Sequence, residues 1–254
     1  MSLSKNKTKY IHALEQKKFR RQENAFVAEG HKSVGDLLMA GCAARLIIAT
    51  EEWQCPVTTD GKTERITVTE EELRKASLLQ HPQQVLGVFS LPETATPPDA
   101  HTVGSELCLC LDGVQDPGNL GTIIRTADWF GIRHIVCSHT TADAFNPKVV
   151  QATMGSIARV RMCYTDLTKW LPSLPKGTPV YGTMLDGDNL YDTHSSRNGV
   201  IVMGNEGNGI STEVAQLLTH RLLIPPYPAG NKTAESLNVS IATAIICAEF
   251  RRNS

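Results

Sequence analysis

Glycine and polar residues follow two short apolar segments near the C-terminal end of the sequence. Residues 200–210 read VIVMGNEGNGI, and residues 222–240 read LLIPPYPAGNKTAESLNVS. Loops of this composition expose backbone N–H and C=O groups to a ligand and hold polar side chains beside it. A buried strand needs none of these residues, so the pattern predicts a small-molecule pocket in this part of the chain.

The loop GNEGNG at residues 204–209 could bind a phosphate, because it lies between a predicted strand and a predicted helix. It matches neither G-x-G-x-x-G nor G-x-x-x-x-G-K-S/T, and no acidic residue for a ribose follows at about 20 positions. A dinucleotide or nucleoside triphosphate site therefore has little support. A glycine-rich turn without a ligand is the simpler alternative.

Arg125 follows Asn119 by six residues in the segment DPGNLGTIIRTADWFGI (116–132), whose apolar spacing predicts a helix. Asn119 is a plausible N-cap of that helix. The guanidinium of Arg125 could bind a phosphate or carboxylate through two parallel hydrogen bonds. A surface ion pair with Asp128, three residues further along the helix, is the simpler role and adds little stability.

A second polar cluster precedes the last predicted helix, which covers residues 237–252. Ser236 or Asn238 could cap this helix, and capping alone is the simpler interpretation. Glu235 and Ser240 add more polarity than one cap needs, which favours a binding role for the group.

The segments that position these residues alternate between strands and helices. After a buried strand at 107–114 and the helix described above, the predicted elements are strand 134–138, helix 147–154, strand 180–184, strand 199–203, helix 212–218, strand 221–224 and the final helix. Such alternation is typical of a mostly parallel sheet with both faces covered. The expected fold class is therefore α/β.

A smaller α/β unit precedes this region. Its predicted elements are helix 4–21, strand 25–28, helix 31–40, strand 46–50, a short helix that begins with the capping-box sequence TEEE at 69–72, and strand 85–91. Residues 92–105, PETATPPDAHTVGS, contain three prolines and no periodicity, which is typical of a linker. We therefore expect domains at 1–91 and 106–254, joined by a linker at 92–105.

Charge, apolar runs and cysteines narrow the class of protein. Residues 1–33 carry eight Lys and Arg against three Asp and Glu, whereas the whole chain has a net charge of −1. A basic arm of this kind suggests contact with a polyanion, and a solvated helix face is the alternative.

No apolar run approaches the roughly 20 residues of a membrane span, and the N-terminus lacks the apolar segment of a signal peptide. We expect a cytoplasmic protein with no membrane contact. The seven cysteines include no C-x-x-C pair, so we expect reduced, buried thiols and no metal site.

Three segments, taken together and in this order, resemble the motifs of SpoU-type (TrmH-like) RNA ribose methyltransferases of the SPOUT superfamily. The first runs from Asn119 to Arg125 as N-x-G-x-x-x-R, the second is the glycine-rich loop at 204–210, and the third joins the Ile-Pro pair at 224–225 to ESLNVS at 235–240. This resemblance covers residues 106–252. FVAEG at 26–30 and HPQQVLG at 81–87 resemble the family's L30e-like RNA-binding domain.

The resemblance implies an α/β fold with a C-terminal trefoil knot and a homodimer in which catalytic groups cross the interface. It also implies S-adenosylmethionine bound by Gly204, Ile224 and Leu237, mostly through the backbone. The link between the Ile-Pro pair and ESLNVS is longer here than in the family. Cofactor contacts around residues 226–234 therefore cannot be carried over.

The implied reaction is methyl transfer to a ribose 2′-hydroxyl of RNA. A general-base role has been assigned to the family's arginine, here Arg125, but a guanidinium holds its proton too tightly for that role. We expect Arg125 to bind the adjacent phosphate and polarise the 2′-hydroxyl, with Asn119 orienting Arg125 or the ribose. Glu206, Ser236 and Asn238 would complete a polar ring around the reacting groups.

RNA would be held by the small domain and its basic arm, through phosphate contacts that do not read sequence. The candidate residues are Lys5, Lys7, Lys9, Lys17, Lys18, Arg20 and Arg21. An L30e-like domain suits structured RNA, which favours ribosomal over transfer RNA. Two other classes stay open: a non-catalytic RNA-binding protein on the same scaffold, and a nucleotide-dependent dehydrogenase, which would need the G-x-G-x-x-G motif that is missing.

Overall fold

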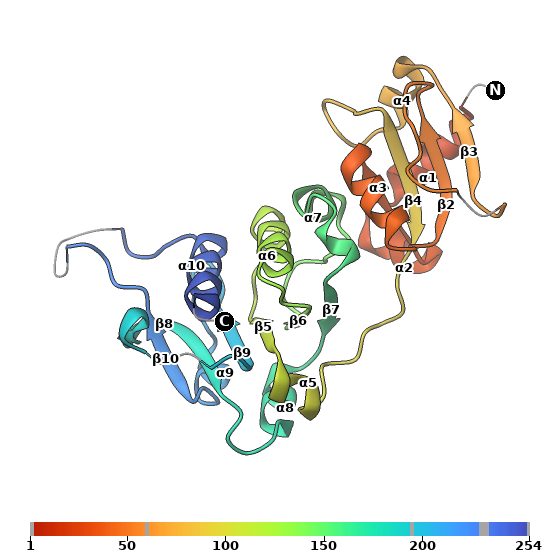
Figure 1. Cartoon of the computed structure of the whole chain (residues 1–254). Helices are drawn as coiled ribbons and strands as arrows, with labels where there is room; N and C mark the ends of the chain where they lie inside the picture. The colour runs from red at the N-terminus through yellow and green to blue at the C-terminus, as the bar shows by residue number, and fades with distance from the viewer. Residues whose placement is uncertain (1–2, 59–60, 194–195, 229–233, 253–254) are drawn as a thin grey trace. The chain divides into compact units, whose positions relative to one another are not determined.

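The computed structural model describes residues 3–58, 61–193, 196–228 and 234–252 (Figure 1). Its contacts divide the chain into two compact units. The first comprises Met1–Glu93 and Asp143–Arg159, and the second comprises Thr94–Ala142 and Val160–Ser254. Residues 143–159, which we expected in the second domain, thus pack with the first unit. Among the described residues, no helix is both long and apolar enough to cross a bilayer.

The first unit is built on a four-stranded mixed sheet in the order β1-β4-β2-β3. Its strands are β1 (Ala25–Glu29), β2 (Ala44–Ala49), β3 (Glu64–Thr67) and β4 (Val85–Ser90). β4 pairs antiparallel with β1 and β2, whereas β3 is parallel to β2. The helices are α1 (Lys5–Ala13), α2 (Lys17–Glu23), α3 (His31–Met39), α4 (Glu70–Ala76), α7 (Pro147–Ala152) and the 3-10 turn η1 (Ser156–Ala158). The capping box expected at 69–72 is confirmed at the start of α4.

The prediction of a single helix over residues 4–21 is wrong, because the structure has two helices there, α1 and α2, separated by a turn. Arg20 explains how the break is stabilised. Its guanidinium donates to the carbonyls of Leu14 (2.8 Å) and Glu15 (2.6 Å) beyond the end of α1 and lies 2.6 Å from the carboxylate of Asp143. Carbonyls at a helix end need such a partner. Arg20 is consequently buried, with 2% of its surface exposed.

Residues 143–159 are held to the rest of the first unit along their whole length. The ring of Phe145 packs on that of Phe26, with centroids 4.9 Å apart. At the far end, Arg159 forms a 3.0 Å ion pair with Asp36 of α3. Gly155 has a φ of 93°, and any side chain there would collide with Asp36. This close approach explains why the chain needs glycine at that point.

The second unit contains a six-stranded sheet in the order β10-β8-β9-β5-β6-β7, in which all paired strands are parallel. The strands are β5 (Leu107–Leu111), β6 (His134–Cys137), β7 (Arg161–Tyr164), β8 (Val180–Asn189), β9 (Gly199–Met203) and β10 (His220–Leu223). The expected α/β class is confirmed. Cys108 and Cys110 of β5 point into the same hydrophobic cluster on one face of the sheet, as their spacing predicted. Burial raises the pKa of the Cys108 thiol to about 12.

Helices cover both faces of this sheet (Figure 1). They are α5 (Ala100–Ser105), α6 (Pro117–Trp129), α8 (Leu167–Trp170), α9 (Thr212–Ala215), α10 (Val239–Arg251) and the 3-10 turns η2 (Leu171–Ser173) and η3 (Leu190–Asp192). α5, α8 and α9 pack on one face, and α6 and α10 lie side by side on the other. α5 occupies the end of the expected linker, where Asp99 caps it.

The pairing of β8 with β10 contains a large irregularity beside the carboxyl ends of the strands. Arg221 pairs with Gly182, but the next residue, Leu222, pairs with Asp188. Residues 183–187 therefore leave the ladder. Gly187 closes this excursion, because a side chain there would lie 2.7 Å from the backbone of residues 221–222. The sequence predicted a plain strand ending at residue 184.

Candidate active site

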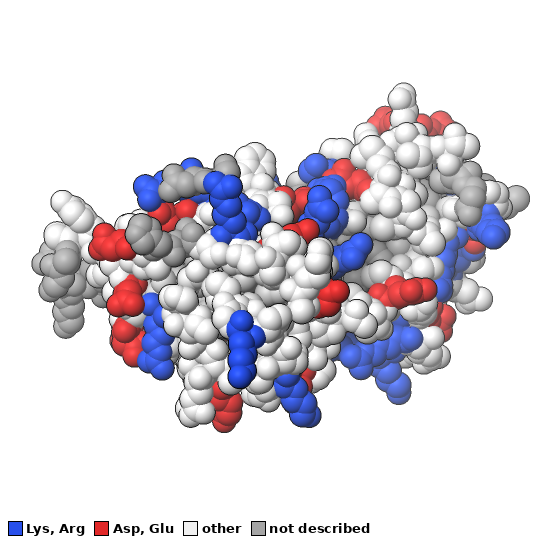
Figure 2. All heavy atoms as spheres, turned by 60° about the horizontal axis from the view of Figure 1, so that its bottom comes forward, with Lys and Arg blue, Asp and Glu red and all other residues white. Residues whose placement is uncertain are grey.

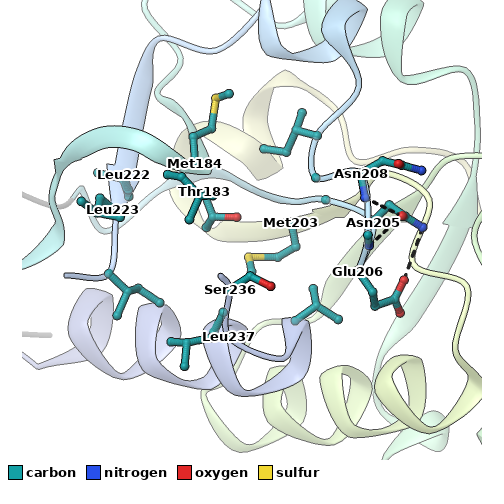
Figure 3. A pocket seen from close by; sticks show the side chains of 18 of the residues that line it. Thr183, Met184, Met203, Asn205, Glu206, Asn208, Leu222, Leu223, Ser236 and Leu237 are labelled. Atoms are coloured by element: carbon teal, nitrogen blue, oxygen red, sulfur yellow. Dashed lines mark hydrogen bonds between the residues drawn. The ribbon is translucent and has the colours of Figure 1, made fainter. Parts of the chain in front are cut away.

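A cavity of about 500 Å³ opens at the carboxyl ends of β8, β9 and β10 (Figure 3). This is the edge where parallel α/β sheets bind ligands, and the volume suits a small molecule. The lining comes from residues 183–186, 203–210, 222–224, 236–237, Val239 and Ala242. Figure 3 shows Leu222 and Leu223 at one end of the cavity and Asn205, Glu206 and Asn208 at the other.

All three residues predicted to bind a cofactor, Gly204, Ile224 and Leu237, line this cavity, as do Glu206 and Ser236. The structure thus brings together three segments that spread over 33 positions of the sequence, from Gly204 to Leu237. Sequence reasoning missed the contribution of residues 183–186, because it ended a regular strand at residue 184 and assigned no role to the residues after it. The only local signal was the glycine at position 187.

The loop at 204–210 is a rigid part of the cavity wall. The backbones of Asn205 and Gly209 exchange two hydrogen bonds, at 2.8 and 2.9 Å. The Asn205 side chain accepts from the N–H groups of Gly207 and Asn208 and donates to the carbonyl of Gly113 at 2.7 Å. These contacts fix the loop against the turn that follows β5.

Glu206 is the acceptor at the centre of a polar network. Its carboxylate accepts from the backbone N–H groups of Gln115 (3.3 Å) and Asp116 (3.2 Å) and from the amide of Asn119 (3.1 Å). Burial acts to raise the pKa of Glu206, but hydrogen bonds from its own backbone, from Asn119 and from the 115–116 backbone outweigh that effect. The pKa therefore lies below its ordinary value of 4.5. Glu206 is ionised at neutral pH and acts only as an acceptor.

The network continues from Asn119 to the start of α10. The side-chain amide of Asn238 donates to the side-chain oxygen of Asn119 at 2.9 Å. The side-chain oxygen of Asn238 caps α10, accepting from the N–H groups of Ser240 (2.9 Å) and Ile241 (3.3 Å). Asn238 is thus both a cap and a member of the network. The expected capping role of Asn119 is wrong, because Asp116 caps α6 and leaves the Asn119 side chain available.

Arg125 stands apart from this network. It is exposed on α6 and does not line the cavity. Its guanidinium forms no ion pair with Asp128 or with any other residue that the structure describes. Within one chain, the structure gathers Asn119, Glu206 and Asn238 but leaves Arg125 outside.

The predicted RNA-binding residues differ in their availability. Lys5, Lys9, Lys17, Lys18 and Arg21 are exposed on the first two helices. Lys7 forms a 2.6 Å ion pair with Glu64. Arg20 does not fit this role, because it is buried and both terminal nitrogens of its guanidinium are already engaged, as described above.

Basic and acidic side chains are interspersed on the face drawn in Figure 2, with no broad single-sign area. On this face, contact with a polyanion would therefore be local. Among the described residues, no cluster of three or more His, Cys, Asp or Glu could hold a metal ion.

Two family models match the chain. Residues 106–248 match the SpoU rRNA Methylase family, and residues 5–87 match the MRM3-like substrate binding domain. A relative from Bacillus subtilis, the 23S rRNA (guanosine(2553)-2′-O)-methyltransferase RlmP, is 31% identical over 252 residues, which cover 98% of each chain.

Solved structures agree with these matches. A TrmH-family protein from Porphyromonas gingivalis superposes with a TM-score of 0.89 at 42% identity and full coverage of both chains. An rRNA methyltransferase from Sinorhizobium meliloti with bound AdoMet (S-adenosylmethionine) gives a TM-score of 0.86 at 33% identity, covering 99% of this chain and 96% of that one.

Proposed function

The chain belongs to the SpoU rRNA methylase family, and from this premise we propose that it transfers a methyl group from S-adenosylmethionine to a ribose 2′-hydroxyl of RNA. The observation that carries the proposal is the cavity at the ends of β8, β9 and β10. The glycine-rich loop, the Ile-Pro segment and the start of α10 meet there, and these segments carry the second and third of the three family motifs.

The cavity fits S-adenosylmethionine in its chemistry. The apolar end at Leu222 and Leu223 suits the flat adenine ring, and Gly204 lines the cavity with backbone atoms alone. The ionised Glu206 at the other end would favour the positive sulfonium centre. When bound, the cofactor supplies a methyl group that the charge on sulfur already activates.

The polar network has the task of orienting the ribose. Glu206 is saturated with donors and has a lowered pKa, so it is a poor proton acceptor and instead fixes Asn119. The side-chain amides of Asn119 and Asn238 each donate one N–H within this network. An amide carries two N–H donors, so one on each stays available for a ribose oxygen. Holding both reactants in position lowers the activation free energy of a two-substrate reaction substantially, because the entropy of bringing them together is already lost on binding.

We infer that Arg125 acts on the active site of a second copy in a homodimer. The guanidinium lies outside the network of its own chain, and Trp129, one helical turn further along α6, is 84% exposed. Ile241, on the adjacent helix α10, is 54% exposed. A second copy seated on this face would bury both side chains and bring Arg125 to the partner's ribose and phosphate. There it would bind the phosphate and polarise the 2′-hydroxyl.

Complementation tests this assignment. Arg125→Ala should abolish methyl transfer and leave the cofactor-induced rise in melting temperature intact. Mixing Arg125→Ala with Asn119→Ala subunits should restore part of the activity, because one of the two sites in a mixed dimer is complete. Normal turnover by Arg125→Ala would remove this residue from the mechanism. A monomer in sedimentation would remove the action across an interface.

Ribosomal RNA is the proposed substrate, in preference to transfer RNA. The support is the MRM3-like substrate binding domain and the full-length similarity to a 23S rRNA methyltransferase. The exposed Lys5, Lys9, Lys17, Lys18 and Arg21 would hold the RNA, with Lys7 once released from Glu64. We propose that the protein acts in the cytoplasm, and we infer a trefoil knot in its C-terminal part from the family.

The deciding experiment supplies labelled S-adenosylmethionine with unmodified ribosomal RNA and, separately, transfer RNA, and then maps the label. Label on a ribose 2′-oxygen of ribosomal RNA is the expected result. Label on transfer RNA alone would overturn the substrate class. RNA binding without cofactor binding or label would favour the alternative, a non-catalytic RNA-binding protein.

A further inference from the structure

A second cavity, of about 540 Å³, lies in the first unit and plays no part in the methyl-transfer site. Its wall takes residues from the first turn of α3, the segment that follows β2, helix α4 and the loop between α4 and β4. The volume falls within the range of small-ligand pockets. All of these residues belong to the segment Met1–Glu93.

A buried carboxylate organises the loop that forms one side of this cavity. Glu29, the last residue of β1, accepts from the hydroxyl of Ser77 and from the N–H of Leu78 at 2.8 Å. The next residue, Gly30, donates its N–H to the carbonyl of Val85 at 2.9 Å. Both ends of the 77–85 loop are therefore tied to β1, and the cavity is fixed before any ligand arrives.

Polar groups at the cavity lack partners. The hydroxyl of Thr50 is buried, with the residue 9% exposed, and has no hydrogen-bond partner among the described residues. The nine-residue helix α3 begins at His31, and the residue before it, Gly30, provides no side-chain cap. A side chain at position 30 would lie 2.7 Å from the amide oxygen of Gln83, so glycine lets this amide sit over the first turn. A buried hydroxyl without a partner calls for an explanation, and a ligand in the adjoining cavity is one.

The charged groups at the cavity have mixed signs. Glu70 and Arg74 stand one turn apart on α4, are exposed, and form no ion pair with any described residue. Glu52 adds a second carboxylate, which contacts the Gln84 amide at 3.4 Å. A phosphate inside the cavity would meet the two carboxylates, and a cation would meet the guanidinium. The ligand that fits is neutral and carries both donors and acceptors.

An unpaired nucleobase has this character. A guanine presents N–H donors that a carboxylate accepts, and on another edge it presents O6 and N7, the usual partners of a guanidinium. Proteins that recognise single-stranded RNA extrude such bases and stack them on planar side chains. His31 and the Gln83 amide provide planar groups at this cavity.

We propose that the cavity takes up one unpaired base of the RNA substrate, guanine by the fit of its edges. Glu70 and Arg74 address the base, and the phosphate of the same nucleotide lies outside the cavity at the first turn of α3. The inference rests on the proposed function, since it presumes an RNA substrate. In this proposal the cavity recognises the base, whereas the basic residues of α1 and α2 contact only the RNA backbone.

Two adjacent carboxylates on α4 give a matched test. Glu70→Ala removes a negative charge from the cavity, and Glu71→Ala removes one from a residue outside it that pairs with Lys75. Loss of a carboxylate near RNA ordinarily tightens binding by relieving repulsion. We expect the opposite for Glu70→Ala, with binding of unmodified ribosomal RNA weakened about five- to 100-fold, and no loss for Glu71→Ala. Arg74→Ala and Lys75→Ala form the corresponding cationic pair.

The dependence of binding on salt separates base from phosphate contacts. Arg74→Ala should weaken binding without changing the slope of log affinity against log salt, because a base contact releases no counterions. Ribosomal RNA transcribed with 6-thioguanosine should cross-link to peptides containing His31 or Gln83. Glu70→Ala that binds as tightly as Glu71→Ala, or cross-links confined to α1 and α2, would overturn the proposal and leave this face for another partner.

Methyl transfer by the wild type reports on the proposed function separately. A wild-type protein that methylates RNA while Glu70→Ala binds RNA normally refutes the base site alone. A wild-type protein that transfers no methyl group refutes the enzyme, and the cross-link still decides whether the cavity holds a base. Cofactor-induced thermal stabilisation should be the same in all four variants.

Discussion

Arg20 and Arg21 are neighbours in the sequence with opposite surroundings, so replacing each by alanine separates a structural from a binding role. Arg20 is buried, contacts Asp143 at 2.6 Å and satisfies two helix-end carbonyls. Arg21 is exposed. Arg20→Ala would leave the Asp143 carboxylate, whose side chain is only 19% exposed, and both carbonyls without their partner.

The magnitude follows from what Arg20→Ala leaves behind. Removing one partner of a buried ion pair costs about 3–5 kcal/mol, because the other charge stays buried without compensation. In a chain of this size each kcal/mol lowers the melting temperature by about 2–4 °C, so we expect a fall of about 6–20 °C. Arg21→Ala should change the free energy of unfolding by less than about 0.5 kcal/mol.

Thermal unfolding and RNA binding together provide the assay. Arg21→Ala should reduce the salt slope of RNA binding by about one, as expected for one lost phosphate contact. Arg20→Ala, measured where it is folded, should leave that slope unchanged. Asp143→Ala should destabilise the protein as Arg20→Ala does, and the double variant should cost less than the sum. Equal melting temperatures for Arg20→Ala and Arg21→Ala would refute the reasoning.

Three further predictions concern single residues. Asn119→Ala removes a hydrogen bond to an ionised carboxylate and should lower kcat/KM for RNA about 10- to 150-fold, with cofactor binding retained; an unchanged rate would show that the network does not orient the ribose. Gly204→Ala places a carbon 2.2 Å from the backbone of Gly209, so it should abolish the cofactor-induced rise in melting temperature while RNA binding persists. Burial raises the pKa of Glu29 above 4.5 against the hydrogen bonds that lower it, so the unfolded chain releases this proton first. The free energy of unfolding, relative to Glu29→Gln, should therefore fall as the pH rises from 4.5 through the raised pKa, and parallel pH profiles in urea unfolding would contradict this.

Local spacing was enough to predict the elements that carry the site. The glycine-rich loop after β9 and the cap of α10 depend on neighbours within a few positions. The alternation of strands and helices was enough to predict a parallel sheet. The TEEE capping box at α4 is of the same kind, since its two hydrogen bonds join residues three apart. Such features are set by contacts that the chain makes with itself locally.

Features that depend on distant segments were not predictable. Nothing local distinguishes Arg20, which is buried against Asp143, from Arg21, which is exposed. The excursion of residues 183–187 depends on the pairing of β8 with β10, and the cavity of the first unit depends on a carboxylate 48 positions away from Ser77. Asn119 looked like a helix cap because its type permits it, and only the position of Asp116 showed otherwise.

The return of residues 143–159 to the first unit makes the protein hard to treat as two exchangeable modules. The chain passes from one unit to the other after residues 93, 142 and 159, so no single cut separates them. A chimaera that replaced only residues 1–91 would keep Asp143 and Arg159 but lose their partners, Arg20 and Asp36. Grafting a new RNA specificity onto this scaffold would therefore require the 143–159 segment to be transplanted with the N-terminal residues, and the two stretches should diverge together in evolution.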